Sequence, residues 1–163
     1  MKTLLLLRHA KSSWKHPELA DHDRPLNKRG KRTAPLIGAL LQDQGLIPDL
    51  ILCSSAVRTH DTALLVAEAC NYGGEIKQTR TLYLAEPQTY VEVLRQVKEK
   101  HARVLVVGHN PGLEALIEAL TGEAMAMPTA ALAYLELPLE HWRDLDMKTI
   151  CKLVDMWRPK DLR

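Results

Sequence analysis

Two arginines and two histidines, far apart in the chain, are of the types that bind and attack an oxyanion. Arg8 and His9 are adjacent, Arg58 follows His9 by 49 positions, and His109 follows Arg58 by 51. A guanidinium can donate two parallel hydrogen bonds to phosphoryl oxygens, and an imidazole can donate a proton or attack phosphorus. A neutral imidazole is abundant near pH 7, which suits a histidine nucleophile. These residue types predict a site for a phosphate dianion and leave open which histidine attacks.

Short apolar runs precede these polar residues, and each run has the composition of a strand buried on both faces. The runs cover residues 4–7, 50–53 and 104–107, and each is too short for an ordinary helix. A helical pattern follows each run, after a loop in the first case. The carboxyl ends of parallel strands share one edge of a sheet, where ligands of open α/β folds bind. We therefore expect the fold to bring the two arginines and two histidines together.

The last quarter of the chain changes from alternating strands and helices to β-rich sequence. Residues 131–137 and 149–157 are expected to pair as an antiparallel ribbon at one side of the sheet. With an edge strand expected near residues 75–79, the order predicts an α/β fold, a three-layer α/β/α sandwich with a mostly parallel central sheet. A length of 163 residues fits a single core, so we expect one domain over residues 1–163.

A long loop and a basic helix are expected between the first two strands. Residues 12–24 are polar and lack periodicity, and long loops beside a site are often functional; within this loop Trp14 is expected to pack against the protein. Asn27 is a suitable N-cap for a helix that Gly45 ends, and Pro35 is expected to kink or restart it. Four cationic residues occupy its early turns: Lys28, Arg29, Lys31 and Arg32. They indicate either a solvated helix face or a basic rim that steers an acidic phosphoprotein.

Composition and charge argue against several classes of partner. The formal net charge is only +2 and seven residues are aromatic, which disfavours a nucleic-acid or membrane partner. Cys53, Cys70 and Cys151 have no paired spacing and fit reduced, buried thiols. Neither a signal peptide nor a transmembrane segment is evident, so a cytoplasmic protein is expected.

Three motifs, together with a fourth between the first two, carry a resemblance to a known family. They are Leu-Arg-His-Ala-Lys-Ser at 7–12, Ser-Ser-Ala-Val-Arg-Thr at 54–59 and Val-Gly-His-Asn-Pro at 107–111, with Pro-Leu-Asn-Lys-Arg-Gly at 25–30. In this order they resemble the histidine phosphatase superfamily, and specifically its SixA branch of phosphohistidine phosphatases. The resemblance implies a phosphoglycerate mutase-like fold.

The resemblance also implies a role for each candidate residue. His9 is implied as the nucleophile that becomes phosphorylated, with Arg8, Arg58 and His109 forming the phosphate pocket around it and with no metal or other cofactor. Three further residues are candidate substrate-binding groups: Lys11, Ser12 and Asn110. The first two either contact phosphate or simply begin the loop that follows.

Departures from the wider superfamily bear on the substrate. Ala10 and Lys11 stand where much of the superfamily has glycine and then an acidic or amide residue, as in the SixA branch. Asn110 stands where the acid phosphatases place a proton-donating aspartate, and only Glu86 lies near the region of the mutases' glutamate, without a secure match. An alkoxide leaving group needs an acid, whereas a phosphorylated imidazole can leave as a neutral ring.

The implied activity is therefore hydrolysis of phosphohistidine on a signalling protein, such as a histidine phosphotransfer domain, through phospho-His9. Within the same class, a small phosphorylated molecule, either a phosphomonoester or another phosphoramidate, is the alternative substrate. From a different class, a non-catalytic phosphate-binding module is the alternative, and the presence of all four pocket residues counts against it.

Overall fold

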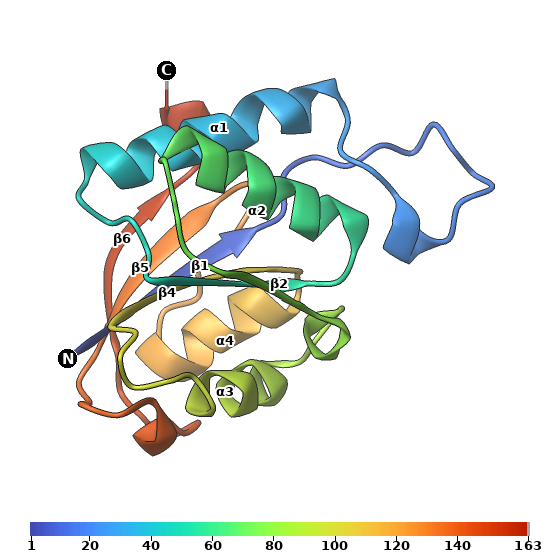
Figure 1. Ribbon diagram of the computed structural model, residues 1–163. Helices are drawn as coiled ribbons and strands as arrows, with labels where there is room; N and C mark the ends of the chain where they lie inside the picture. Colours follow the sequence, from blue (N-terminus) through green and yellow to red (C-terminus); the bar gives the residue numbers. More distant parts are fainter. Residues whose placement is uncertain (163) are drawn as a thin grey trace.

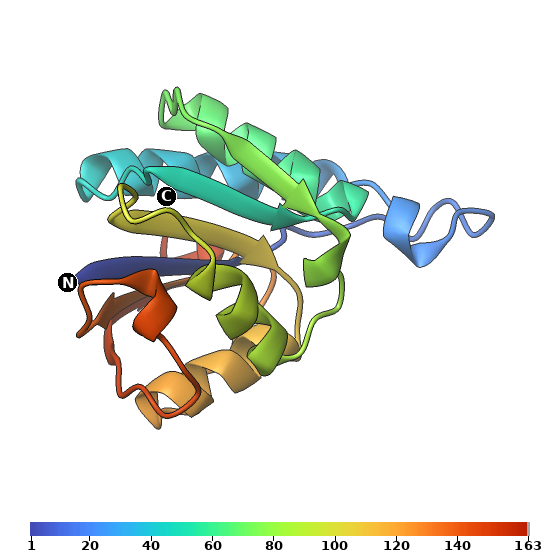
Figure 2. The same ribbon diagram turned by 60° about the horizontal axis from the view of Figure 1, so that its bottom comes forward.

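The computed structural model describes residues 1–162 as a six-stranded sheet with helices on both faces (Figure 1, Figure 2). The strands are β1 (Lys2–Arg8), β2 (Leu50–Ser54), β3 (Ile76–Thr79), β4 (Arg103–Gly108), β5 (Leu132–Leu137) and β6 (Lys152–Trp157). The α-helices are α1 (Lys28–Asp43), α2 (Val57–Ala69), α3 (Pro87–Arg95) and α4 (Gly112–Thr121). Short 3₁₀ helices are η1 (Asp21–Asp23), η2 (Arg80–Leu82), η3 (Trp142–Asp144) and η4 (Pro159–Asp161). No helix within these residues is both long and apolar enough to cross a membrane.

The sheet has the order β3-β2-β4-β1-β5-β6. The first four of these strands run parallel, β5 is antiparallel to β1, and β6 is antiparallel to β5. The predicted three-layer sandwich with a mostly parallel sheet is therefore confirmed, as are the edge position of β3 and the antiparallel ribbon. The ribbon is part of the main sheet because β5 also pairs with β1.

The leucine run of β1 separates two apolar cores. Leu4 and Leu6 belong to the core that packs under α3 and α4, whereas Leu5 and Leu7 belong to the core under α1 and α2. All four side chains are fully buried. A strand covered on both faces needs apolar residues at every position, which explains the continuous run in place of alternation.

Helix α1 begins and ends where the sequence predicts, but Pro35 does not divide it. The side chain of Asn27 accepts the Gly30 N–H at 2.8 Å, and Gly45 has a φ of +67° just beyond the last turn. One helix runs from Lys28 to Asp43, so the expected restart at Pro35 is wrong. The proline removes one backbone hydrogen bond, and burial of Ile37 and Leu41 beyond it holds the helix in place.

The strand ends that carry the candidate residues meet at one edge of the sheet. The register of β1 and β4 pairs Arg8 with Gly108, and Ser54 ends β2 on the other side of β4. A Cβ atom at Gly108 would lie 2.3 Å from the hydroxyl oxygen of Tyr90 on α3. Glycine at this position therefore lets α3 approach the edge at which the polar residues gather.

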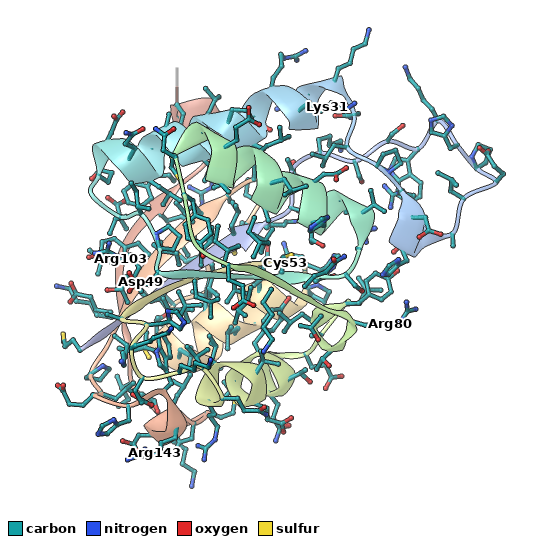
Figure 3. The ribbon with its side chains drawn as sticks, in the orientation of Figure 1. Lys31, Asp49, Cys53, Arg80, Arg103 and Arg143 are labelled. Atoms are coloured by element: carbon teal, nitrogen blue, oxygen red, sulfur yellow. The ribbon has the colours of Figure 1, made fainter. Side chains whose placement is uncertain are left out.

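The three cysteines are buried, free thiols, as the sequence predicts. Cys53 lies on β2 in the interior (Figure 3). Burial raises the pKa of Cys53 to about 12 and the pKa of Cys151 to about 11. Both thiols therefore remain protonated and act as small apolar side chains.

Candidate active site

A pocket of about 270 Å³ opens at the carboxyl edge of the sheet. Its lining includes all seven candidate residues: Arg8, His9, Lys11, Ser12, Arg58, His109 and Asn110. Five residues that the sequence did not indicate also line it: Trp14, Asp21, Arg24, Leu84 and Thr129. The fold thus gathers into one pocket side chains from widely separated positions.

His9 follows β1 and presents one ring nitrogen with a free electron pair. Its Nδ1 lies 2.8 Å from the carbonyl oxygen of Ala10, and because a carbonyl only accepts, Nδ1 carries the proton and Nε2 does not. Burial lowers the pKa of His9 to about 4, and the positive charges of Arg58 and Arg8 act in the same direction. The ring is therefore neutral near pH 7, which is the state required for attack on phosphorus.

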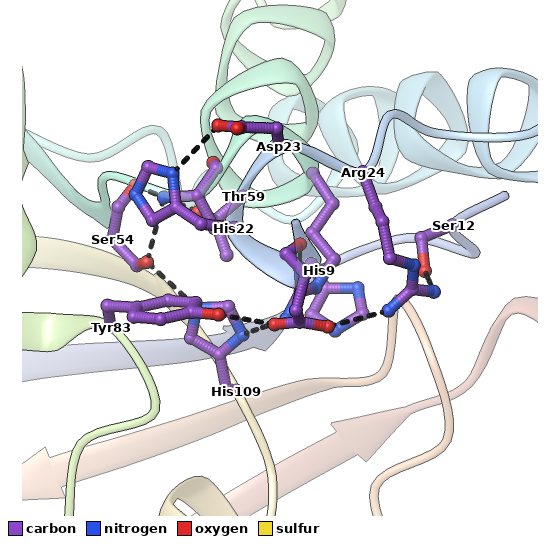
Figure 4. Close-up of polar contacts among 12 residues, drawn as sticks. His9, Ser12, His22, Asp23, Arg24, Ser54, Thr59, Tyr83 and His109 are labelled. Carbon is purple, nitrogen blue, oxygen red and sulfur yellow. Dashed lines mark hydrogen bonds and ion pairs between the residues drawn. The ribbon is translucent and has the colours of Figure 1, made fainter. Parts of the chain in front are cut away.

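His109 follows β4 and has the opposite tautomer. Its Nδ1 lies 3.5 Å from the guanidinium of Arg58 and its Nε2 lies 2.8 Å from the hydroxyl of Ser54. A guanidinium only donates, so Nδ1 accepts and Nε2 carries the proton. Burial lowers the pKa of His109 to about 3, and the charge of Arg58, together with that of His9 when its ring is protonated, acts in the same direction. The two histidine rings lie 5.4 Å apart, centre to centre (Figure 4).

The two arginines come from different elements and are held by backbone oxygens. Arg8, at the end of β1, donates from Nη1 to the carbonyl oxygen of Met127 at 3.0 Å. Arg58, in the first turn of α2, donates from Nη1 to the carbonyl oxygen of Asp21 at 2.7 Å. Burial lowers the pKa of Arg8, and Glu114 partly opposes this shift. Arg8 stays charged because the ordinary pKa of a guanidinium is so high.

Asp21, from the loop between β1 and α1, faces the same arginines. Its carboxylate accepts from Nη2 of Arg58 at 2.9 Å, from Nη1 of Arg24 at 2.9 Å, and from the hydroxyl of Tyr83. Burial favours the neutral acid, yet these hydrogen bonds prevail and hold the pKa of Asp21 well below its usual range. Asp21 is therefore an anion that occupies donors suited to phosphate.

Tyr83 connects this loop to the histidine of β4. Its ring meets the rings of His22 and His109 edge-on, with centres 4.9 and 5.4 Å away (Figure 4). His22 lies in the loop between β1 and α1, and its Nε2 is 2.7 Å from the hydroxyl of Ser55. The loop is thus tied to the residue that follows β2.

Arg24 fixes the first part of the loop. Its guanidinium donates to the Ser12 hydroxyl at 2.5 Å and to the Ser13 carbonyl at 3.1 Å (Figure 4). The same group lies 3.3 Å from the ring centre of Trp14, close enough for a cation–π contact. Trp14 is 75% exposed, so little of it is packed against the protein, and it lines the pocket beside Arg24.

Asn110 and Lys11 differ in how they face the pocket. The amide nitrogen of Asn110 donates to the carboxylate of Glu114 and to the carbonyl of Met127, both at 2.9 Å. Its N–H donors are thus engaged by the protein. Lys11 is exposed and leaves its ammonium group available at the mouth. Glu86 is the N-cap of α3 and is absent from the pocket lining.

Asp21 and Arg24 were missed because an aperiodic loop gives no pattern that places a side chain. The available signal was Arg24 itself, which directly precedes the Pro-Leu-Asn-Lys-Arg-Gly segment. That segment returns the chain to the site, since the Asn27 N–H donates to the Lys11 carbonyl at 3.0 Å. Within residues 1–162, no three side chains of His, Cys, Asp and Glu group in a way that could hold a metal ion.

Fold and pocket together define an α/β protein with an anion site at the carboxyl edge of a mostly parallel sheet. Residues 4–83 match the histidine phosphatase superfamily (branch 1). An uncharacterized protein of Mycobacterium tuberculosis is 34% identical over 152 residues, which cover 86% of this chain and 92% of that relative. The chain belongs to the histidine phosphatase superfamily, and it is a phosphatase of that superfamily.

Solved structures support the same placement. A structure from Agrobacterium tumefaciens, provisionally named phosphohistidine phosphatase SixA, is 33% identical, with a TM-score of 0.83 over 97% of this chain and 98% of that one. A protein histidine phosphatase SixA complexed with tungstate has a TM-score of 0.84 over 98% of both chains. Its identity is 21%, so this second likeness shows the fold alone.

Proposed function

We propose that this phosphatase hydrolyses phosphohistidine on a protein, through a covalent intermediate on His9. The observation that carries the proposal is the state of the His9 ring. Its Nδ1–H is held by the Ala10 carbonyl, its Nε2 has a free electron pair, and its pKa of about 4 keeps it neutral near pH 7. The expected substrate is a signalling protein of the cytoplasm, such as a histidine phosphotransfer domain.

The other pocket residues hold the phosphoryl oxygens in this proposal. Arg8 and Arg58 supply paired donors, and Arg58 exchanges its bonds to Asp21 for bonds to phosphate. The arriving dianion offsets the arginine charges and raises the pKa of His109, so that a protonated Nδ1 becomes a further donor. Lys11 and Ser12 complete the mouth, and Asn110 orients the segment around Met127.

The scarcity of carboxylic acids in the pocket lining favours a phosphoramidate substrate. Among the described lining residues Asp21 is the sole carboxylic acid. It accepts three hydrogen bonds and is ionised, so it has no proton to give a leaving group. An alkoxide would leave without help, whereas an imidazole that already carries a proton on its other nitrogen leaves as a neutral ring.

The proposed chemistry balances without an added acid, because nucleophile and leaving group are the same kind of ring. Neutral Nε2 of His9 attacks phosphorus, and the substrate P–N bond breaks with its electron pair returning to the leaving nitrogen. Water then attacks phospho-His9, the P–Nε2 bond breaks, and neutral His9 is restored. The phosphate leaves as H₂PO₄⁻, which retains both protons of the attacking water.

A matched pair of peptides tests the substrate class. One carries phosphohistidine and the other phosphoserine at the same place in the same sequence. We expect kcat/KM to be at least about 100-fold higher for phosphohistidine, since the missing general acid is worth about that factor or more. Equal values for the two peptides would refute the proposed leaving group.

Trapping tests the nucleophile separately. Brief reaction with labelled phosphohistidine peptide, followed by alkaline quenching, is expected to leave acid-labile phosphate on the wild-type enzyme and none on His9→Ala. Retention of the label by His9→Ala would assign the nucleophile to another residue.

A further inference from the structure

A second, smaller pocket adjoins the active site. It has a volume of about 110 Å³ and is lined by residues from four segments: Lys11, Arg29, Thr33, Pro128, Thr129, Arg158, Pro159 and Lys160. We call it the basic pocket. Lys11 and Thr129 line both pockets, so the basic pocket continues directly from the site that holds His9.

All the charged residues that line the basic pocket are cationic. Lys11, Arg29, Arg158 and Lys160 are cationic and no lining residue is acidic. Within residues 1–162 no ion pair involves any of these four side chains; Arg158 donates to the carbonyl oxygen of Ala126 at 3.3 Å. The carboxylate of Asp161 lies nearby, where it accepts the backbone N–H of Arg158 at 3.1 Å, but it does not line the pocket. The four lining cations repel one another, and an anion between them relieves that repulsion.

Folding stability alone does not favour this placement. Arg29 lies in the first turn of α1, which contains no acidic residue. The first turn of a helix is its positive end, so acidic side chains stabilise it and basic ones do not. An anion bound beside this turn, where Arg29 and Thr33 line the pocket, gains from the cations.

The backbone fixes the basic pocket relative to His9. A Cβ atom at Gly30 would lie 2.2 Å from the carbonyl oxygen of Lys11, so glycine lets the first turn of α1 rest against the chain beside the active site. On the other wall, the N–H of Ala130 donates to the carbonyls of Arg8 at 3.1 Å and His9 at 3.0 Å. An anion in the basic pocket is thus held at a set distance from the reacting phosphate.

We propose that the basic pocket binds a carboxylate side chain that flanks the phosphohistidine, so that the enzyme selects acidic protein substrates. This inference rests on the proposed function, because a protein substrate carries its neighbouring anions as Asp and Glu side chains. It also decides between the two readings of the basic helix: Arg29 contributes to substrate binding, whereas Lys31 faces a different hollow beside Leu64 and Leu65. Figure 3 shows Lys31 on α1.

Two phosphohistidine peptides test the proposal, one with glutamates beside the phosphohistidine and one with glutamines in their place. The variants are the double substitution Arg29→Ala with Lys160→Ala, and the control Lys31→Ala from the same helix. We expect wild type to prefer the glutamate peptide, and the double variant to lose about three- to tenfold in kcat/KM for it through KM, consistent with partly exposed ion pairs. The glutamine peptide and Lys31→Ala are expected to change little.

Other outcomes overturn the proposal in distinguishable ways. A loss with Lys31→Ala as large as with the double variant indicates long-range steering instead of a site. If the double variant loses kcat/KM equally for the glutamate and glutamine peptides, or for neither, the basic pocket does not bind a carboxylate of the substrate. Hydrolysis of free phosphoramidate by wild type and not by His9→Ala tests the proposed chemistry independently. If a bisphosphorylated small molecule alone responds to the double variant, the anion is a second phosphate and the carboxylate assignment fails.

Discussion

The active-site pocket has two halves, and the protein holds them in different ways. The sheet half consists of Arg8, His9, Arg58 and His109, which stand at strand ends or in the first turn of α2. His9 is 7% exposed, Arg58 4% and His109 1%. The backbone amides of the two histidines are also bound, one by the carbonyl of Gly108 and the other by the hydroxyl of Tyr90.

The loop half consists of Trp14, Asp21 and Arg24, from the segment between β1 and α1. The base of this segment is pinned, since the Ser13 N–H donates to the Pro25 carbonyl at 2.8 Å. Beyond its base the segment projects past the sheet (Figure 1, Figure 2), and the side chain of Asp21 is 43% exposed. Side-chain hydrogen bonds and the Trp14 contact hold this half to the site.

In the proposed function, this structural difference divides the residues that carry out the chemical step from those that select the substrate. Groups on a rigid sheet keep a fixed geometry, which the proposed attack on phosphorus and stabilisation of its charge require. Arg24 is 7% exposed, but Trp14 and the side chain of Asp21 are exposed, and exposed loop contacts can be exchanged for substrate at low cost. We therefore expect changes in the sheet half to lower kcat and changes in the loop half to alter binding.

The largest expected contrast compares one arginine from each half. Arg58→Lys is expected to lower kcat by about 10²- to 10³-fold, because an ammonium cannot give the paired donors that a guanidinium gives to phosphoryl oxygens. Arg24→Lys is expected to raise KM by less than about tenfold with little change in kcat. Steady-state kinetics measures both, and thermal unfolding checks that each variant is folded. An equal fall in kcat would erase the distinction between the halves.

The pH dependence of the free energy of unfolding tests whether water is excluded from the sheet half. The pKa of His9 is about 4 when folded, against about 6.5 in an unfolded chain. Because the unfolded state binds the proton first as pH falls, this contribution to stability is complete above pH 6.5 and is lost toward pH 4. Between pH 7 and pH 5 the loss from His9 is about 2 kcal/mol.

Urea unfolding at these two pH values measures that loss. His9→Gln has no titrating ring and is expected to lose about 2 kcal/mol less than wild type over the same interval. Equal losses in the two proteins would mean that the His9 ring is hydrated and titrates normally, which would weaken the case for a neutral nucleophile.

The same division explains what the sequence could predict. Continuous or periodic apolar residues mark buried strands and helices. The apolar runs at 4–7, 50–53 and 104–107 therefore predicted the strands whose ends carry the sheet half. The parallel arrangement followed from their alternation with helices, and it is what makes their ends converge. The restart considered at Pro35 does not occur, since one helix runs from Lys28 to Asp43 and burial of Ile37 and Leu41 outweighs the local loss of a hydrogen bond.

The loop half lies beyond that kind of reasoning. Asp21 gains its significance from Arg58 and Tyr83, which are far from it in sequence, and no periodicity in residues 12–24 aims its carboxylate at them. Trp14 was expected to pack against the protein, and its ring lies against the guanidinium of Arg24 while the residue is 75% exposed. Such placements depend on how the loop folds back, which is a property of the assembled site.

Removing the loop carboxylate is expected to sharpen the comparison further. The carboxylate of Asp21 occupies the guanidinium of Arg58, and in the proposed function phosphate must displace it, so Asp21→Asn is expected to lower the Ki of inorganic phosphate by about fivefold. The control is Asp23→Asn, which removes the same charge from a residue whose partner is His22. Competitive inhibition assays measure both. Weaker phosphate binding in Asp21→Asn would show that the carboxylate positions the arginines instead of competing for them.

The smallest expected effect concerns the aromatic contact at the pocket mouth. Trp14→Leu removes the ring beneath Arg24 and is expected to raise KM about twofold to threefold with kcat unchanged, the size of an exposed cation–π contact. The matched control is Trp157→Leu, whose ring stacks on Tyr134 with centres 6.5 Å apart and is absent from the pocket lining. Steady-state kinetics with a phosphohistidine peptide separates the two parameters. A fall in kcat for Trp14→Leu would place this loop residue among the groups that support chemistry, and the boundary between the halves would have to move.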